Sequence, residues 1–434
     1  MDKKHFSLTA AVILGLLLVS CSSLPFFNPP DSGTPESELA PTSTPVAPPP
    51  TEDIVPTTTI RTTLIVWVPP QLDPASDSPA GNLFADQLNA FRSERPQIDL
   101  QVRVKAVEGP GGLLETIRAA RAAAPRVLPD LIALPRNQME TAADEELLMP
   151  LDDYLGKIEG DGWYPFAASL SRFEEVTYGV PFLGDVLVLA YKSDISEDPL
   201  ADWDSVLETQ KALAFPAADT RSLVTLAFYQ SAGGELGDLN EPPAVDRIPL
   251  LNVLNYYQQA QAGSVMPYWV TQFETDQQSW EAYRERQATL VLTWSSTYFN
   301  AESPNTSLAP FPTRDGVPYT YGTGWVWAVT SPEPERAELA LRLIEELMDP
   351  DFLGSWSYEL GYLPVKSSVA QTWGGNLSAP FLDKMLLSAR MVPEQRILTS
   401  VGPLLRDAVL AVLKDQVEPE AAVEEFLGRV EELP

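Results

Sequence analysis

The chain of 434 residues contains one histidine and one cysteine, and both lie near its N-terminus, at His5 and Cys21. The remaining 413 positions, from residue 22 onward, therefore have no imidazole and no thiol. This absence excludes Ser-His-Asp and Cys-His nucleophilic catalysis, zinc sites built from thiolates or imidazoles, and disulfide bonds. Any catalysis in the main part of the chain would have to use carboxylates, lysine or tyrosine.

Basic residues are also scarce, with 29 Lys and Arg against 60 Asp and Glu, so the formal net charge is −31. A surface this acidic repels phosphate backbones, and we therefore expect no nucleic-acid partner. Hydrophobic residues make up 44% of the chain and aromatic residues 9%, which is enough apolar material for a large core. The length predicts two or three folded units.

The N-terminus carries a targeting pattern. Lys3 and Lys4 precede an apolar stretch over residues 8–19, which is too short to span a bilayer and is typical of a signal peptide. The stretch ends in Leu18-Val19-Ser20-Cys21, which resembles the lipobox of bacterial lipoproteins. The resemblance implies a signal peptide over residues 1–20, cleavage before Cys21 and acylation of this cysteine. The alternative is an ordinary secreted protein in which the cysteine stands by chance.

Residues 22–59 include ten prolines among serine, threonine and acidic residues. Fixed φ angles and missing N–H donors disfavour helix and sheet there, and few large apolar groups are present to offset the entropy of ordering. We therefore expect residues 21–60 to form a tether that begins at the acylated cysteine. The expected location is the extracytoplasmic face of the cell membrane, extracellular or periplasmic, with a lipid anchor.

From residue 62 onward, apolar strand patterns alternate with helical ones. Strands are predicted over residues 64–68, 98–107 and 129–134, with helices over residues 83–91 and 113–124 between them. A βαβαβ series of this kind predicts a parallel sheet flanked by helices, with ligand sites at the carboxyl ends of its strands. A second set of strand and helix patterns follows, so the predicted fold class is α/β with two lobes.

Five segments carry a resemblance to a known family. They are Tyr178-Gly179-Val180-Pro181 with Asp185 and the following strand to Asp194, Pro129–Ile132 with Asp152-Asp153-Tyr154, Ser231–Glu235, Gly324–Val329 with the following helix, and Gly361–Val365. In this order the chain resembles the extracellular solute-binding proteins of ABC importers, in the sugar-binding group (family 1) that includes maltodextrin-binding proteins. Each segment is weak alone, and the set covers residues 62–432.

The resemblance implies a two-lobed, type II periplasmic-binding-protein-like fold, with parallel-dominated sheets and a hinged cleft. We expect lobe 1 to comprise residues 61–183 and 313–365, and lobe 2 residues 184–312 and 366–434. The implied function is capture of a sugar or oligosaccharide in the cleft and its delivery to the permease subunits of an ABC transporter. A monomer without cofactor, metal or catalytic residue is expected.

The candidate ligand-binding residues supply aromatic faces and hydrogen-bonding groups, as a sugar site requires. They are Asp185, Trp294, Trp325, Arg136, Asn137, Gln71, Tyr298 and Tyr362. Asp185 stands at the family's spacing from Pro181 and is the strongest candidate, as an acceptor for two ligand hydroxyls. The alternative for Asp185 is a hinge or capping role, and for the aromatic residues it is core packing.

The chain departs from the family pattern at several positions, so the pattern does not identify the ligand. Pro69-Pro70-Gln71-Leu72-Asp73 replaces the polar and charged set that follows the first strand of maltodextrin binders, and Arg136-Asn137-Gln138 replaces a charged pair. These differences argue against maltodextrin itself. Two alternative functions remain: a secreted glycosidase that uses carboxylates, and a sensor that presents its ligand to a signalling receptor.

Overall fold

The computed structural model describes residues 62–123, 127–154, 162–196, 200–237, 244–301, 303–331, 333–374 and 377–433. The predicted signal peptide, Cys21 and the predicted tether lie outside these residues. None of the described helices is both long enough and apolar enough to span a membrane.

The first strands form the predicted βαβαβ series. Strand β1 (Thr62–Val68) pairs in parallel with β2 (Ile98–Val104) on one side and with β3 (Leu131–Pro135) on the other. Helices α1 (Pro79–Glu94) and α2 (Leu113–Ala123) connect these strands. Five consecutive residues of β1 are buried, as expected for a strand covered on both faces.

Two long strands continue the sheet in the antiparallel sense. β10 (Thr320–Val329) pairs with β3 and with β6 (Val180–Lys192), and the order of the main sheet is β2-β1-β3-β10-β6-β8-β7. The α/β fold class is confirmed, while the centre of the sheet is antiparallel and its outer pairs are parallel. Twelve of the thirteen residues of β6 are buried, and uniform burial does not encode strand direction.

Strand β6 is long enough to pair with different strands along its length. Its first half pairs with β10, and from Leu187 onward it pairs with β8 (Leu290–Trp294) and β9 (Thr306–Pro310). The shorter strands β7 (Leu213–Ala214) and β11 (Ala389–Met391) pair in parallel with β8 and β10, respectively. β6 therefore joins the two parts of the sheet.

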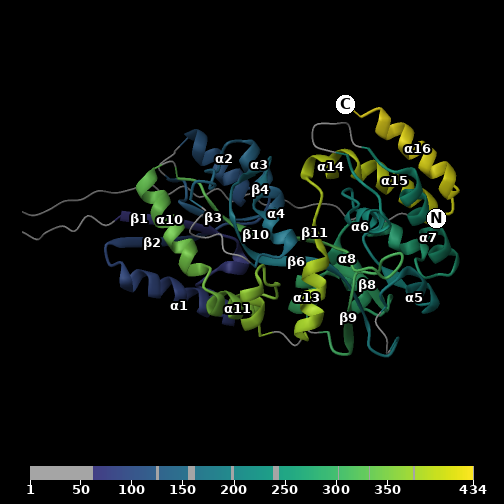
Figure 1. Cartoon of the computed structure of the whole chain (residues 1–434), viewed down its shortest axis with the longest axis horizontal. Helices are drawn as coiled ribbons and strands as arrows, with labels where there is room; N and C mark the ends of the chain where they lie inside the picture. The colour runs from purple at the N-terminus through teal and green to yellow at the C-terminus, as the bar shows by residue number, and fades with distance from the viewer. Residues whose placement is uncertain are drawn as a thin grey trace, which may run out of the picture. The chain divides into compact units, whose positions relative to one another are not determined.

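Further helices cover both faces of the sheet (Figure 1). In chain order they are α3 (Arg136–Asp144), α4 (Pro165–Leu170), α5 (Trp203–Glu208), α6 (Leu223–Ser231), α7 (Arg247–Ala262), α8 (Asp276–Arg284), α9 (Ser295–Asn300), α10 (Pro334–Leu347), α11 (Pro350–Glu359), α12 (Ser367–Thr372), α13 (Ala379–Ser388), α14 (Gln395–Ser400), α15 (Gly402–Leu413) and α16 (Pro419–Glu431). Two short 3₁₀ turns, Pro70–Leu72 and Tyr268–Gln272, and the two-stranded ribbon of β4 (Arg172–Phe173) and β5 (Val176–Thr177) complete the named elements.

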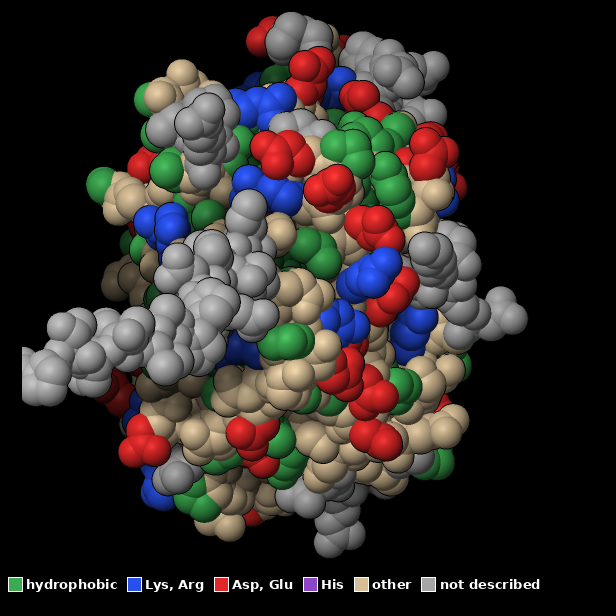
Figure 2. Space-filling model, turned by 90° about the vertical axis from the view of Figure 1, so that its left-hand side faces the viewer, with side chains coloured by type: hydrophobic (Ala, Val, Ile, Leu, Met, Phe, Trp, Pro, Cys, Tyr) green, Lys and Arg blue, Asp and Glu red, His purple; other side chains and the backbone are tan. Residues whose placement is uncertain are grey.

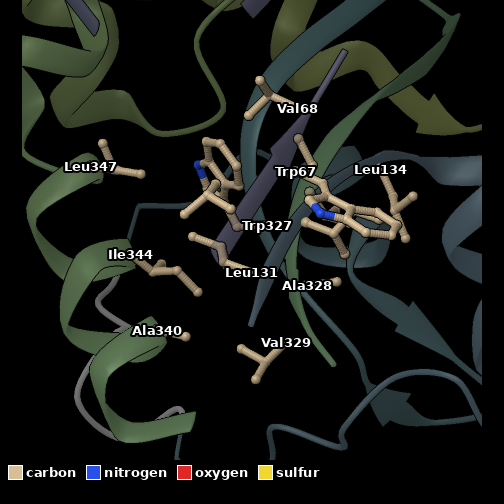
Figure 3. Packing of buried hydrophobic residues seen from close by; sticks show 14 of the residues in the cluster. Trp67, Val68, Leu131, Leu134, Trp327, Ala328, Val329, Ala340, Ile344 and Leu347 are labelled. Atoms are coloured by element: carbon tan, nitrogen blue, oxygen red, sulfur yellow. The ribbon is translucent and has the colours of Figure 1, made fainter. Parts of the chain in front are cut away.

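One hydrophobic core lies around β1, β3 and β10. Figure 3 shows Ile344 and Leu347 of α10 directed toward Leu131 and Trp327 of the sheet. Trp327 stacks on Phe182 with ring centroids 4.5 Å apart. Aromatic stacking of this kind adds to the stabilisation that burial provides.

A second core surrounds the later part of β6 and is built with α6, α7, α15 and α16. A third, smaller cluster contains Tyr164 and Phe166 from the start of α4, Val186 of β6, and Leu382 and Met385 of α13. Residues of β6 belong to all three clusters, so this strand is shared by every part of the core.

Charged side chains of both signs cover the outside of the molecule. On the face shown in Figure 2, acidic side chains are interspersed with basic ones and with neutral polar groups. The negative charge is thus dispersed over this face rather than gathered in one patch.

Candidate functional site

Asp185 lies where β6 changes partners, opposite Thr323 of β10, and its side chain is buried with 7% exposure. Oδ1 accepts hydrogen bonds from the Ser295 hydroxyl at 2.6 Å and from the Ser296 backbone N–H at 2.9 Å. Oδ2 accepts one from the Ser296 hydroxyl at 2.5 Å. The carboxylate thereby holds the first turn of α9, and three of its roughly four acceptor positions are used within the protein.

Burial raises the pKa of Asp185 from 3.8 to about 6, although the hydrogen bonds from Ser295 and Ser296 oppose the shift. Asp276, which accepts hydrogen bonds from Thr293 and Thr297 beside the same helix, adds a smaller repulsive contribution to the pKa of Asp185. Because the group is desolvated, its charged form is less favourable than in water. Asp185 thus holds α9 in place and also lines the adjacent cavity.

This cavity has a volume of about 210 Å³. It is lined by Pro135, Arg136, Asn137, Glu140, Asp185, Arg221, Leu223, Trp294, Thr323, Gly324, Trp325, Tyr362, Val392, Pro393, Gln395 and Leu398. The structure therefore brings together six of the eight predicted ligand-binding residues. Gln71 and Tyr298 are not among the lining residues: Gln71 is exposed in the turn after β1, and Tyr298 packs on Phe299 in α9.

Three aromatic side chains contribute to the cavity wall. Trp294 ends β8 and is half-buried, while Trp325 of β10 retains 8% exposure. Burial raises the pKa of Tyr362 to about 12, so its hydroxyl is protonated near neutral pH and can donate a hydrogen bond. The backbone oxygen of Tyr362 accepts a hydrogen bond from Trp373 Nε1 at 3.1 Å, which fixes this segment.

A buried ion pair also lines the cavity. Arg136 Nε donates to Glu140 Oε1 at 2.7 Å, and both side chains are at least 94% buried. Arg136 Nη1 also donates to the backbone oxygens of Leu170, at 3.0 Å, and of Arg172. Burial lowers the pKa of the Arg136 guanidinium, and the charge of Glu140 opposes this shift. The guanidinium is thus largely committed to protein partners.

Other polar groups reach the cavity from separate elements. Asn137 begins α3 beside Arg136, and Gln395 begins α14; both side chains are half-buried and carry an amide. Arg221 lies before α6 with half of its side chain exposed, 3.4 Å from Asp219. Amides can donate to and accept from ligand hydroxyls, and a planar guanidinium can donate to several of them.

Sequence reasoning missed the lining residues that come from the segment after β11. These residues are Val392, Pro393, Gln395 and Leu398. They line the cavity together with residues that are far away in the sequence, such as Asp185. A local signal was present, because Pro393 and Glu394 directly before a helix mark a helix start, but nothing in the sequence shows what that helix faces.

Among the residues that the structure describes, no group of three or more His, Cys, Asp or Glu side chains could hold a metal ion. The cavity therefore combines an aromatic wall, amides and hydroxyls with two carboxylates that are already held by protein donors. Such a lining can bind and orient a polar organic molecule.

A family model described as bacterial extracellular solute-binding protein matches residues 88–380, more than half of the chain. The chain belongs to this family. The predicted recognition of a solute-binding protein is confirmed, and the family places the folded part of the chain outside the cytoplasm. No curated protein matches the sequence.

Solved structures of other solute-binding proteins share the fold. Maltose-bound MalE3 of T. maritima is 18% identical with a TM-score of 0.65, and the match covers 86% of this chain and 100% of that one. The cyclic α-maltosyl-1,6-maltose binding protein of Arthrobacter globiformis is 17% identical with a TM-score of 0.69, covering 86% and 98%. The sugar-binding protein MalE of Xanthomonas citri is 17% identical with a TM-score of 0.68, covering 86% and 97%. The predicted two-lobed periplasmic-binding-protein-like fold of this solute-binding protein is confirmed.

Proposed function

We propose that this solute-binding protein captures a carbohydrate in the cavity beside Asp185 and releases it unchanged to an ABC permease. The observation that carries the proposal is the composition of the cavity wall, which combines the aromatic residues Trp294, Trp325 and Tyr362 with residues that carry amide and hydroxyl groups. Aromatic faces suit the C–H surfaces of a sugar ring, and planar polar groups suit its hydroxyls. The fold shared with sugar-binding proteins supports this choice of ligand class.

Ligand entry would follow opening between two lobes with the boundaries given above, residues 61–183 and 313–365 against residues 184–312 and 366–434. The distribution of buried clusters on either side of Asp185 supports this division. A ligand that contacts both lobes shifts the open–closed equilibrium by its differential affinity for the two states. The closed, liganded form is then what the permease recognises.

The proposed anchor is the acylated Cys21, with residues 21–60 as a spacer between the membrane and the folded part. Cys21→Ser should release the protein from the membrane fraction into the soluble fraction, because acylation at this thiol is then impossible. Fractionation and mass spectrometry of the mature N-terminus measure this. A soluble wild-type protein that lacks lipid would refute the anchor without affecting the sugar site.

A thermal-shift screen against monosaccharides and oligosaccharides tests the ligand class, since a ligand that binds only the native state raises the melting temperature. Trp294→Ala should weaken binding of the sugar found by about 5- to 150-fold, or ~1–3 kcal/mol. Trp269→Ala provides the matched control, because Trp269 is also half-buried but does not line the cavity. Equal affinities of wild type and Trp294→Ala would refute the site.

The proposal includes the absence of catalysis. Asp185 and Glu140 both line the cavity, but each carboxylate is held by protein donors rather than directed at an open reaction centre. Incubation of the protein with a glycan panel should therefore leave every glycan intact. Hydrolysis that Asp185→Asn abolishes would replace transport with a glycosidase function.

A further inference from the structure

Trp294 lies at the junction of β8 and α9, and its indole lines the cavity beside Asp185. The indole is half-buried and packs at the edge of the second core. Trp327 in the first core stacks on Phe182, but within the part of the chain that the structure describes no aromatic ring stacks on Trp294. The orientation of this indole therefore depends on how its backbone is held, over residues 293–297, which we name the platform segment.

Two carboxylates hold the platform segment. Asp185 holds its two serines, as described above. Asp276, the first residue of α8, accepts hydrogen bonds at Oδ2 from the hydroxyls of its two threonines, Thr293 at 3.0 Å and Thr297 at 2.7 Å. The four residues that share the segment with Trp294 therefore all donate a side-chain hydrogen bond to one of these two carboxylates.

Asp276 reaches the segment from the side opposite to the indole. Side chains alternate between the two faces of a strand, so Thr293 and Trp294 point to opposite faces of β8. Thr293 is fully buried and bonds to Asp276, whereas Trp294 pairs with Leu187 of β6 and lines the cavity. Asp276 is not among the residues that line the cavity. Its effect on the ligand site therefore passes through the platform segment.

Asp276 is itself fixed in place. α8 begins with a reciprocal pair of hydrogen bonds between Thr275 and Gln278, and the helix packs on β8 in a buried cluster around Trp280. The first turn of a helix favours a carboxylate electrostatically. Burial raises the pKa of the Asp276 carboxyl, while hydrogen bonds from both threonines and from the backbone of Trp294 oppose the shift. The last of these bonds connects the carboxylate directly to the tryptophan.

A fixed indole favours ligand binding. A sugar ring needs an aromatic face at one orientation, and a side chain that becomes ordered only on binding lowers the affinity by about 2- to 10-fold. Because the platform segment is hydrogen-bonded on both sides of Trp294, the orientation of the indole is set before the ligand arrives.

We propose that Asp276 is a positioning residue for Trp294: together with Asp185 it fixes the indole from behind the cavity wall, without touching the ligand. This inference rests on the proposed carbohydrate function and deepens it, because it assigns a role in binding to a residue outside the cavity.

Fluorine NMR of the protein labelled with fluorotryptophan tests the positioning without any ligand. The chain has ten tryptophans, and the signal that Trp294→Phe removes belongs to Trp294. We expect one sharp signal for Trp294 in the wild type. Asp276→Ala should broaden or split this signal, because the indole then exchanges between orientations. A single signal as sharp as that of the wild type in folded Asp276→Ala would overturn the proposal.

The chain offers a matched control in Asp202. This half-buried residue lies directly before Trp203 and caps α5, where it accepts a hydrogen bond from the Ser205 backbone N–H at 2.7 Å. Asp202→Ala should lower the stability through loss of the cap but leave the Trp294 signal sharp. If Asp276→Ala fails to fold, Thr297→Val removes one of the two hydroxyl donors and should broaden the same signal to a smaller extent.

A double-mutant cycle measures the effect on binding, with glucose, galactose, mannose, xylose and their disaccharides as probes in calorimetric titrations. Asp276→Ala should weaken binding of the preferred sugar by ~3- to 10-fold in the wild-type background. In the Trp294→Ala background the same change should alter the affinity by less than about 2-fold, since its effect passes through the indole. Asp202→Ala should leave the affinity unchanged.

The outcomes separate this inference from the proposed function. An equal loss of affinity from Asp276→Ala in both backgrounds overturns the positioning of Trp294 and leaves the carbohydrate function standing. If the wild type binds none of these sugars, the carbohydrate function fails, while the fluorine spectra still decide whether Asp276 positions Trp294.

Discussion

Asp185 shows how one residue can be predicted as important while its surroundings remain hidden. The spacing from Pro181 and Tyr191 identified it in the sequence. Its partners Ser295 and Ser296 are more than 100 positions away in the chain, and the structure shows that they use most of its acceptor capacity. Asp185 therefore caps a helix, which was the alternative prediction, and also lines the cavity. Only a tertiary structure shows that one side chain has both roles.

Asp185→Asn should alter the pH dependence of stability. The pKa of Asp185 in the folded state, about 6, lies above its ordinary value of 3.8, so the folded protein binds this proton more tightly than the unfolded chain does. The resulting stabilisation is present below pH ~4 and is lost as the pH rises to about 6. A shift of this size corresponds to about 3 kcal/mol.

Asparagine stays neutral throughout, so the free energy of unfolding of the wild type relative to Asp185→Asn should fall by about 3 kcal/mol from pH 4 to pH 7. Urea unfolding of both proteins at several pH values measures this difference. Asp86→Asn, on the exposed side of α1, provides the matched control substitution. Parallel stability profiles of wild type and Asp185→Asn would contradict the buried environment described here.

The Arg136–Glu140 pair makes a second prediction at the level of single residues. Glu140→Ala removes the charged partner of a buried guanidinium and should reduce the free energy of unfolding by ~3–5 kcal/mol. The matched control is Glu338→Ala, because Glu338 pairs with Arg342 at the same i,i+4 spacing in α10 with both side chains more than half exposed. That change should have little effect, since exposed ion pairs contribute little. Chemical denaturation compares the two, and equal losses would argue against a buried pair.

At the scale of elements, long periodic segments were predictable from the sequence and short ones were not. The pattern predicted β1, α2 and β3 close to their observed bounds. The sequence did not predict the six-residue helices α4, α9 and α12 or the three-residue strand β11. Such short elements contain too few residues to show a period. Two of the missed elements adjoin lining residues of the cavity, because α9 follows Trp294 and β11 precedes Val392.

Gly324 of β10 lies where the backbones of two central strands are in close contact, and this explains why the position is a glycine. A Cβ added there would lie 2.0 Å from the backbone oxygen of Leu183 on β6. Gly324→Ala should therefore force the strands apart and reduce the free energy of unfolding by ~1–3 kcal/mol. Gly428, within helix α16, has nothing within 4 Å of an added Cβ, so Gly428→Ala should raise the free energy of unfolding by ~0.5–1 kcal/mol.

Thermal or chemical unfolding of the two alanine variants measures this contrast, because both introduce the same methyl group. Opposite signs are expected. A neutral Gly324→Ala variant would mean that β6 and β10 can separate at this position without loss, which their unbroken pairing from Gly322 to Trp325 disfavours.

At the scale of the whole molecule, the sequence predicted two lobes, and the fold shared with solved solute-binding proteins agrees. The predicted lobe boundaries say where the chain passes from one half to the other, but the sequence could not predict how the strands pair where the halves meet. Uniformly buried strands reveal neither their direction nor their neighbours, so the antiparallel centre formed by β6 and β10 emerged only from the structure. The same limit applies to the cavity, whose wall is completed by residues after β11.

The shared strand has a consequence for cooperativity. β6 contributes Phe182 to the first core, Leu187 to the second, and Val186 to the third cluster, where α4 and α13 meet. Neither half can unfold without exposing part of this strand, and we therefore expect a single cooperative transition in scanning calorimetry, with equal calorimetric and van't Hoff enthalpies.

Leu386→Ala, which removes a buried contact in the third cluster, should weaken this coupling and broaden or split the transition. Leu353→Ala, equally buried but confined to the first core, serves as the control that should lower the melting temperature without splitting the transition. Two resolved transitions in the wild-type protein would show that β6 does not couple the cores and that each half folds independently.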